Sequence, residues 1–148
     1  GENVYMDETN LRLVMNIRNN FSRLADKLII EGDTLRAVKV LNKCIDLMPH
    51  EKVEYNYFML PIAESLYACG EIEKARMIIS TMQEMFEEKL TYYAQFEEEN
   101  KDAVRSDTQR SLSLYNSIVR VVMANDTEAY AEGIANDFQT RMKTSNFR

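Results

Sequence analysis

The chain has 148 residues, of which 45% are apolar and 28% charged, a length and balance typical of one globular domain. It contains only four Gly and two Pro, too few to separate the many short strands of a sandwich or barrel, so an all-helical fold is favoured. A net charge of −6 argues against nucleic-acid binding, and a single His with two Cys argues against a typical zinc site.

The first predicted element is a helical extension that covers residues 1–17. Asp7 or Thr9 is expected to cap it, because Asp and Thr side chains accept hydrogen bonds from the free N–H groups at a helix start. Its apolar residues, which recur at helical spacing, are Leu11, Val14, Met15 and Ile17. The extension is therefore expected to run directly into the next helix.

Residues 18–51 have the pattern of a helical hairpin. Gly32 followed by Asp33 is typical of a helix end and an immediate helix start. Pro49 then stops the second helix. The apolar residues that recur every three or four positions are Phe21, Leu24, Leu28 and Ile29 before the turn, and Ala37, Val40, Leu41, Cys44, Ile45 and Met48 after it.

Residues 56–97 repeat this arrangement, with Gly70 and Glu71 in place of Gly32 and Asp33. A polar linker, residues 50–55, separates the two hairpins. Pro61 is unfavourable deep in a helix, so the first helix of this hairpin is expected to begin late, near Phe58 or Leu60, and to be short.

The second helix of this hairpin lacks a stop signal. Apolar residues keep helical spacing from Ala75 to Phe96, which predicts a helix of roughly 35 Å. Its expected end lies at the three carboxylates of residues 97–99, because negative charge is unfavourable at a helix C-terminus. Such a long apolar helix needs a partner, either the N-terminal extension or a second molecule. The second case predicts a structural self-association domain that forms a homodimer with no ligand groove in use.

Residues 107–142 form a third helical pair with a weaker pattern. Asn125 to Glu128 stand where Gly and an acidic residue stood before, and their side chains suit a turn that caps the following helix. Gly133 has no assigned role. The predicted fold is therefore all-α: antiparallel helical hairpins stacked as a short α-solenoid, with two clear repeats and a degenerate capping hairpin, within a single domain of residues 1–148.

The first two hairpins resemble the tetratricopeptide repeat. The large, small, Gly and Pro positions of that family's pattern are filled in the first repeat by Phe21, Leu24, Ala25, Leu28, Gly32, Ala37, Leu41, Cys44 and Pro49. In the second repeat they are filled by Met59, Ile62, Ala63, Leu66, Gly70, Ala75, Ile79 and Met82, and the Pro is missing. Small residues at such positions let neighbouring helices approach closely.

This resemblance implies a concave surface lined by the first helix of each repeat, which in this family binds proteins or peptides. The candidate protein-binding residues are Asn19, Ser22, Arg23, Asp26 and Ile29 from the first repeat, and Tyr57, Leu60, Glu64 and Tyr67 from the second. An alternative of equal weight is that these residues pack against the long helix or the N-terminal extension. The family's carboxylate-clamp positions lack the required Lys and Asn, so recognition of a C-terminal carboxylate is not expected.

The sequence contains no catalytic motif. His50 is the only His and stands beside Pro49 without a recognisable nucleophile, and neither a G-x-G nor a Walker pattern is present. Glu87 and Glu88 fit a solvated helix face. We therefore expect this chain to be no enzyme and to use no cofactor or metal.

Two features bear on the compartment. The longest apolar run, residues 57–63, contains Pro61 and is far shorter than the roughly 20 residues of a membrane span, so no span is expected. Cys44 and Cys69 stand at apolar helical positions and are interpreted as free thiols, with a disulfide as the alternative.

Three stretches, residues 3–12, 18–25 and 51–64, resemble the C-terminal soluble region of bacterial multi-spanning membrane proteins of a family long labelled as of unknown function. That family is similar to protein O-mannosyltransferase-type glycosyltransferases. The resemblance implies a non-catalytic protein-interaction or scaffolding domain at the C-terminal end of such an enzyme. Its catalytic carboxylates belong to the membrane part, and none is carried onto this chain.

The same resemblance implies a location and partners. This segment would be an extramembrane tail of an inner-membrane protein on the periplasmic side; without the resemblance, a cytoplasmic location is expected. The implied partner is a protein or peptide, either the parent enzyme or its acceptor. Asp33-Thr34-Leu35 matches a short bacterial O-glycosylation pattern, although a turn between helices is the better interpretation.

Overall fold

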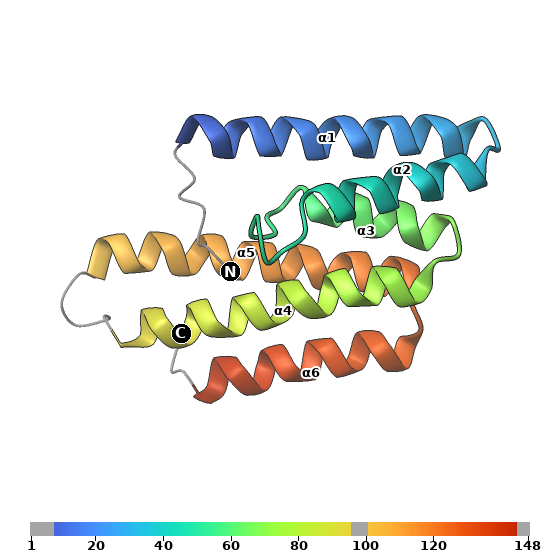
Figure 1. Ribbon diagram of the computed structural model, residues 1–148. Coiled ribbons are helices and arrows are strands. Elements are labelled where there is room, and N and C mark those ends of the chain that lie inside the picture. The colour runs from blue at the N-terminus through green and yellow to red at the C-terminus, as the bar shows by residue number, and fades with distance from the viewer. Residues whose placement is uncertain (1–7, 96–100, 145–148) are drawn as a thin grey trace. The chain divides into compact units, whose positions relative to one another are not determined.

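The computed structural model describes residues 8–95 and 101–144, and over this part the chain is all-helical with no strand, which confirms the predicted fold class (Figure 1). The six helices are α1 (Glu8–Ile30), α2 (Thr34–Leu47), α3 (Met59–Ala68), α4 (Ile72–Ala94), α5 (Lys101–Asn125) and α6 (Glu128–Thr144). Thr9 lies inside α1, so the prediction that it caps the helix is wrong, and Asp7 is outside the described residues.

Contacts between residues group the chain into two compact units, Gly1–Ile79 and Ser80–Arg148. The boundary falls inside α4, so this helix contributes its first residues to one unit and the rest to the other. The length of the chain predicts a single domain of residues 1–148, whereas the contacts form two groups.

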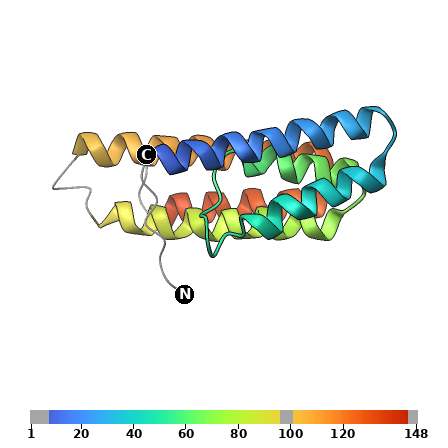
Figure 2. The same ribbon diagram turned by 45° about the horizontal axis from the view of Figure 1, so that its top comes forward.

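The first unit is built on the hairpin of α1 and α2, which lie antiparallel and side by side (Figures 1 and 2). Both helices also pack against α3. Ala25, Ala37 and Ala63 are fully buried, and their small side chains let the helix backbones come close. Larger buried residues fill the remaining space, among them Leu41, Cys44, Ile62 and Leu66.

The two glycine turns have the same geometry. Gly32 has a φ of 81° and Gly70 a φ of 79°, a left-handed conformation that favours glycine. In each turn the glycine N–H and the next N–H bond back to carbonyls of the preceding helix, as in Asp33 N to Leu28 O at 2.8 Å and Glu71 N to Leu66 O at 2.9 Å. The prediction that both glycines end helices is confirmed.

The starts of α2 and α3 also follow the sequence. Asp33 caps α2, because its side chain accepts a hydrogen bond from Arg36 N at 3.2 Å. Of Asp33-Thr34-Leu35, Asp33 lies in the turn between the helices, and Thr34 and Leu35 are the first two residues of α2. α3 begins at Met59 and has ten residues, as the position of Pro61 predicts. Pro61 falls in the first turn, where a helix needs no N–H donor.

In the second unit, α5 and α6 form a hairpin. α5 begins at Lys101, before the predicted start at residue 107. The turn lies between Asn125 and Glu128 as predicted, and Thr127 Oγ1 accepts a hydrogen bond from Tyr130 N at 3.2 Å. Gly133 lies within α6.

The part of the long helix α4 that belongs to the second unit has a partner there. Phe86 and Leu90 are buried, and the Phe86 ring meets the Tyr115 ring of α5 edge-on at 5.3 Å. α5 therefore supplies a partner for Phe86. The expectation that the N-terminal extension or a second molecule covers the apolar end of this helix stays a prediction. The helix is described to Ala94, so its predicted end at residues 97–99 lies outside the described residues.

Candidate functional site

The residues predicted to line a concave surface differ widely in exposure. Arg23, Asp26, Tyr57 and Glu64 are exposed, and Asn19 and Ile29 are half-buried. Three others are buried, with exposed fractions of 4% for Ser22, 3% for Leu60 and 8% for Tyr67. These three side chains are part of the packed interior and offer almost no area to a ligand.

One of the exposed polar residues, Asp26, joins α1 to α3. Ser65 Oγ of α3 donates a hydrogen bond to Asp26 Oδ1 of α1 at 2.8 Å. This bond places Asp26 beside the turn of α3 that carries Glu64. Arg23 lies one turn before Asp26 on α1. We call these residues, with Asn19, the α1–α3 face: Asn19, Arg23, Asp26 and Glu64.

Arg18 lies next to this face but points into the interior, where its side chain has an exposed fraction of 0%. Its guanidinium donates hydrogen bonds to three backbone carbonyls that follow α2: Met48 O at 3.3 Å, Val53 O at 2.8 Å and Glu54 O at 3.0 Å. Arg18 Nε is buried without a hydrogen-bond partner among the described residues. The guanidinium therefore holds the linker between the two hairpins.

The linker residues close over Arg18. The Arg18 guanidinium lies 5.5 Å from the centre of the Tyr55 ring. His50 Nδ1 accepts a hydrogen bond from Tyr55 N at 3.0 Å, and the two rings meet edge-on at 5.1 Å. The only His of the chain thus has a structural partner in the linker, which lowers its value as a catalytic candidate.

Burial controls the titration of the groups around Arg18. Burial lowers the pKa of the Arg18 guanidinium and raises the pKa of the Cys44 thiol to about 11, while the positive charge of Arg18 lowers the Cys44 value in part. Burial also raises the pKa of Tyr55. Both cysteines are free, Cys44 buried and Cys69 half-buried. A neutral thiol is a poor nucleophile, so Cys44 acts as a small apolar residue.

Sequence reasoning missed the role of Arg18, although a signal exists. Val14, Arg18 and Ala25 lie on one helical stripe, and all three are buried. A cation on an otherwise apolar stripe is expected to be buried, and a buried guanidinium needs several hydrogen-bond acceptors because an unpaired buried charge is unfavourable. The acceptors themselves are backbone carbonyls, which no side-chain pattern reveals.

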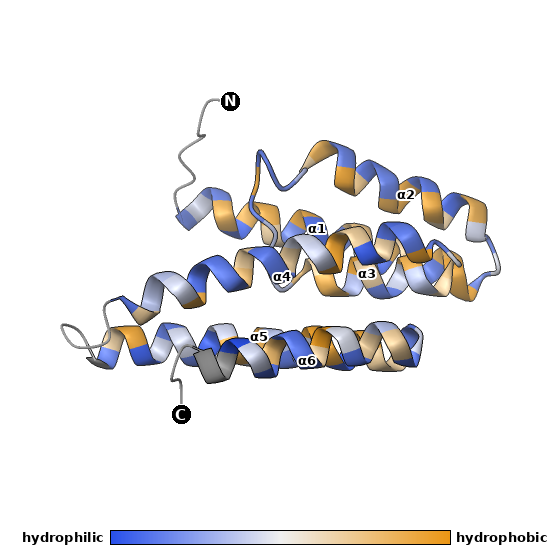
Figure 3. Cartoon of the chain, turned by 90° about the horizontal axis from the view of Figure 1, so that it is seen from below, coloured by the Kyte–Doolittle hydropathy of each residue, from blue (hydrophilic) through white to orange (hydrophobic). Residues whose placement is uncertain are grey.

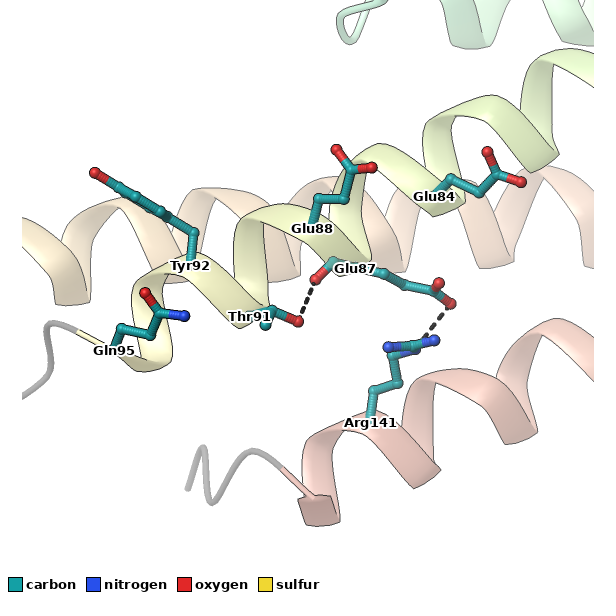
Figure 4. Close-up of a pocket in the computed structure, with 7 residues that line it drawn as sticks. All are labelled: Glu84, Glu87, Glu88, Thr91, Tyr92, Gln95 and Arg141. Carbon is teal, nitrogen blue, oxygen red and sulfur yellow. Dashed lines mark hydrogen bonds and ion pairs between the residues drawn. The ribbon is translucent and has the colours of Figure 1, made fainter.

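The second unit has an open pocket of about 470 Å³ between α4 and α6 (Figure 4). Glu87 of α4 and Arg141 of α6 form an ion pair of 2.9 Å across it, and Thr91 Oγ1 donates to Glu87 O at 2.8 Å. Glu84 and Glu88 extend from α4 into solvent (Figure 4). This pocket is a solvated, net negative surface that links two helices.

In the part of the chain that the structure describes, no group of three or more His, Cys, Asp or Glu side chains is arranged to hold a metal ion. Over the same residues, no helix combines the length and hydrophobicity that a membrane span requires. Comparison of the chain with protein-family models, with curated proteins and with solved structures finds no match.

Proposed function

We propose that this chain is a non-catalytic protein-interaction domain that contacts its partner through the α1–α3 face. The observation that carries the proposal is the Ser65 to Asp26 hydrogen bond, which fixes α1 to α3 beneath exposed charged side chains. Groups of both signs on rigid helices, here Arg23 with Asp26 and Glu64, suit recognition of a polar peptide segment with little loss of conformational entropy. Tyr57, exposed before α3, adds an aromatic side chain of the kind enriched at interfaces.

A non-catalytic role is consistent with the state of the reactive side chains. His50 is hydrogen-bonded to the linker backbone, and Arg18 holds backbone carbonyls. The Cys44 thiol has a raised pKa and is buried. Each of these groups therefore has a packing role, and we assign no cofactor or metal to the chain.

The test is selection of peptides on the immobilised chain from a random display library. The selected peptides are then measured against the variants Arg23→Glu and Glu64→Lys. Each variant reverses one charge of the α1–α3 face and is expected to weaken binding about tenfold, because rim charges orient the partner. Lys52→Glu, an exposed substitution in the linker, serves as the matched control and should leave affinity unchanged.

Peptides that bind equally well to Arg23→Glu, Glu64→Lys and the unsubstituted chain would contradict this assignment of the face. Specific binding means that an excess of the unlabelled peptide displaces the labelled one. If no selected peptide shows such displacement, the interaction function itself is contradicted.

We infer further, from the stretches at residues 3–12, 18–25 and 51–64, that the chain is the periplasmic, C-terminal tail of a glycosyltransferase-like membrane protein. Its partner is then the parent enzyme or the acceptor protein. The decisive observation is the reading frame that encodes it. A frame that continues upstream into hydrophobic spans supports this inference, and a frame that begins and ends with this chain refutes it.

Self-association is the alternative function, and it rested on the apolar length of α4. Within the second unit the Phe86 ring contacts the Tyr115 ring of α5, so this part of the helix has one partner inside the chain. Sedimentation of the chain at tens of micromolar distinguishes the two functions. A monomer supports the interaction domain, and a stable dimer supports self-association.

A further inference from the structure

One side of the α1–α2 hairpin carries exposed apolar residues together with two cations. On α1 it carries Leu13, Ile17 and Leu24, and on α2 it carries Arg36, Val40, Lys43 and Leu47. The α2 set recurs at spacings of four, three and four residues, and the α1 set at spacings of four and seven, so each forms one stripe along its helix. We call these seven residues the outer face.

Two hydrogen bonds fix the direction of the outer face. Asp26 of α1 is bonded to α3, and at about 100° per residue Leu24 lies about 160° away from it around the helix axis. Asn42 of α2 accepts a hydrogen bond from Lys74 Nζ of α4 at 2.9 Å, and Leu47 lies about 140° from Asn42. The α1 stripe therefore faces away from α3, and Leu47 on the α2 stripe faces away from the start of α4.

The leucines of the outer face are open to solvent. The exposed fractions are 56% for Leu13, 48% for Leu24 and 56% for Leu47, while Ile17 and Val40 are half-buried. Figure 3 shows hydrophobic residues interspersed with hydrophilic ones along both helices. A stack of helical hairpins needs a polar end, because an apolar end continues to attract further helices. This end of the hairpin is therefore suited to one more helix.

Charge identifies the kind of helix that fits. The chain has a net charge of −6, yet α2 carries Arg36, Lys39 and Lys43 against a single acidic residue, Asp46. Arg36 and Lys43 lie within the apolar stripe, and Lys39 borders it. A second copy of the chain, docked through the same face by two-fold symmetry, would double the cations of the interface without adding an acidic residue of the outer face to pair with them, which is unfavourable.

We propose that the outer face binds an acidic amphipathic helix of a partner protein. Its apolar residues, at spacings of three and four, pack on Leu13, Leu24 and Leu47, and its flanking Asp or Glu side chains pair with Arg36 and Lys43. This interface lies on a different side of α1 from the α1–α3 face, so it goes beyond the function proposed above.

The test uses a fluorescein-labelled helical peptide of about 18 residues, with Leu at spacings of three and four and Glu on both flanks, and a matched peptide with Lys in place of Glu. Fluorescence anisotropy is expected to show that the intact chain binds the Glu peptide at least about tenfold more tightly than the Lys peptide. The preference should shrink as salt is added, since salt screens exposed charges.

Three variants locate the interface. The double variant Arg36→Glu with Lys43→Glu should reverse the preference between the peptides. Leu24→Glu should weaken binding of the Glu peptide about tenfold and, because Leu24 is exposed, leave the circular dichroism spectrum unchanged. Arg23→Glu, which changes the α1–α3 face, should have an effect within about twofold.

Equal binding of the two peptides, or an equal loss with Arg23→Glu, would overturn the proposal. Dimerisation of the chain that Leu24→Glu abolishes would also overturn it, because a second copy would then cover the outer face. The α1–α3 face is tested separately by Arg23→Glu and Glu64→Lys, so either proposal can fail alone.

Discussion

Arg18 shows how one buried side chain can determine the path of a loop. Five guanidinium N–H groups radiate in a plane, and here the two terminal nitrogens reach carbonyls at Met48, Val53 and Glu54. Those carbonyls lie after the end of α2, where no helical N–H group is available to donate to them. The charge of Arg18 is thus stabilised by backbone dipoles and by the face of the Tyr55 ring.

Arg18→Met is expected to lower the free energy of unfolding by about 2–4 kcal/mol, because three carbonyls lose their donors while the apolar stem is kept. Urea denaturation followed by circular dichroism measures the change. Arg23→Met, on the exposed side of the same helix, is the control and should change the value by no more than about 0.5 kcal/mol. A variant Arg18→Met as stable as this control would show that the linker does not depend on the guanidinium.

The two cysteines should differ in reactivity. The Cys44 thiol is 1% exposed and has a pKa of about 11, so at neutral pH it is both shielded and protonated, whereas Cys69 is half-buried at the end of α3. Iodoacetamide is expected to modify Cys69 at least about tenfold faster than Cys44, and Cys44 only after unfolding in urea. Intact-mass measurements on Cys44→Ser and Cys69→Ser assign the sites. Rapid modification of Cys44 in the folded Cys69→Ser variant would contradict this.

At the scale of elements, turns were the most predictable feature. Gly32 and Gly70 occur at equivalent positions because both end a helix in a conformation that costs other residues free energy, so the sequence marks them clearly. Apolar spacing likewise predicted the helices themselves. The linker after Pro49 was predicted only as polar, since its shape depends on backbone acceptors for Arg18.

Substitution by alanine should lower the stability of the chain at Gly32 and Gly70 and raise it at Gly133. Gly32→Ala and Gly70→Ala are expected to destabilise the chain by about 1 kcal/mol each, because their positive φ is unfavourable for a side chain even though a Cβ would meet nothing within 4 Å. Gly133→Ala, inside α6 and also in open space, should stabilise it by about 0.5–1 kcal/mol. Urea denaturation of all three variants measures this contrast. A stabilising Gly70→Ala would contradict the helix-end role.

The candidate site was less predictable than the helices. Helical spacing placed Ser22 and Asp26 on one side of α1, but only tertiary packing decides that the first is buried and the second exposed. Leu60 and Tyr67 are buried for the same reason, since α3 is covered on most of its circumference. A periodic pattern identifies which side chains share a face and does not identify which neighbouring helix covers that face.

At the scale of the whole molecule, each compact unit has a polar group at its centre. Arg18 occupies this place in the first unit. In the second, Tyr115 stacks on Phe138 at 4.5 Å and donates a hydrogen bond to Ile134 O at 3.1 Å, while Gln83 Nε2 donates to its hydroxyl at 3.3 Å. Tyr115 thereby joins α4, α5 and α6, so its protonation state bears on the stability of that unit.

The stability of the chain is therefore expected to fall above about pH 10. Burial raises the pKa of Tyr115 to about 12 from its ordinary value of 10.0, and the nearby Asp137 and Glu87 carboxylates add to this, against the hydrogen bond from Gln83. Between these pH values the folded chain keeps the Tyr115 hydroxyl proton, which the unfolded chain has released. The contribution of protonated Tyr115 to the free energy of unfolding is therefore complete below pH 10 and is lost as the pH approaches 12. Tyr115→Phe, measured by urea denaturation across this range, should lose about 1 kcal/mol at neutral pH and show a shallower decline in alkali. An equally steep decline in Tyr115→Phe would show that other groups cause the alkaline loss.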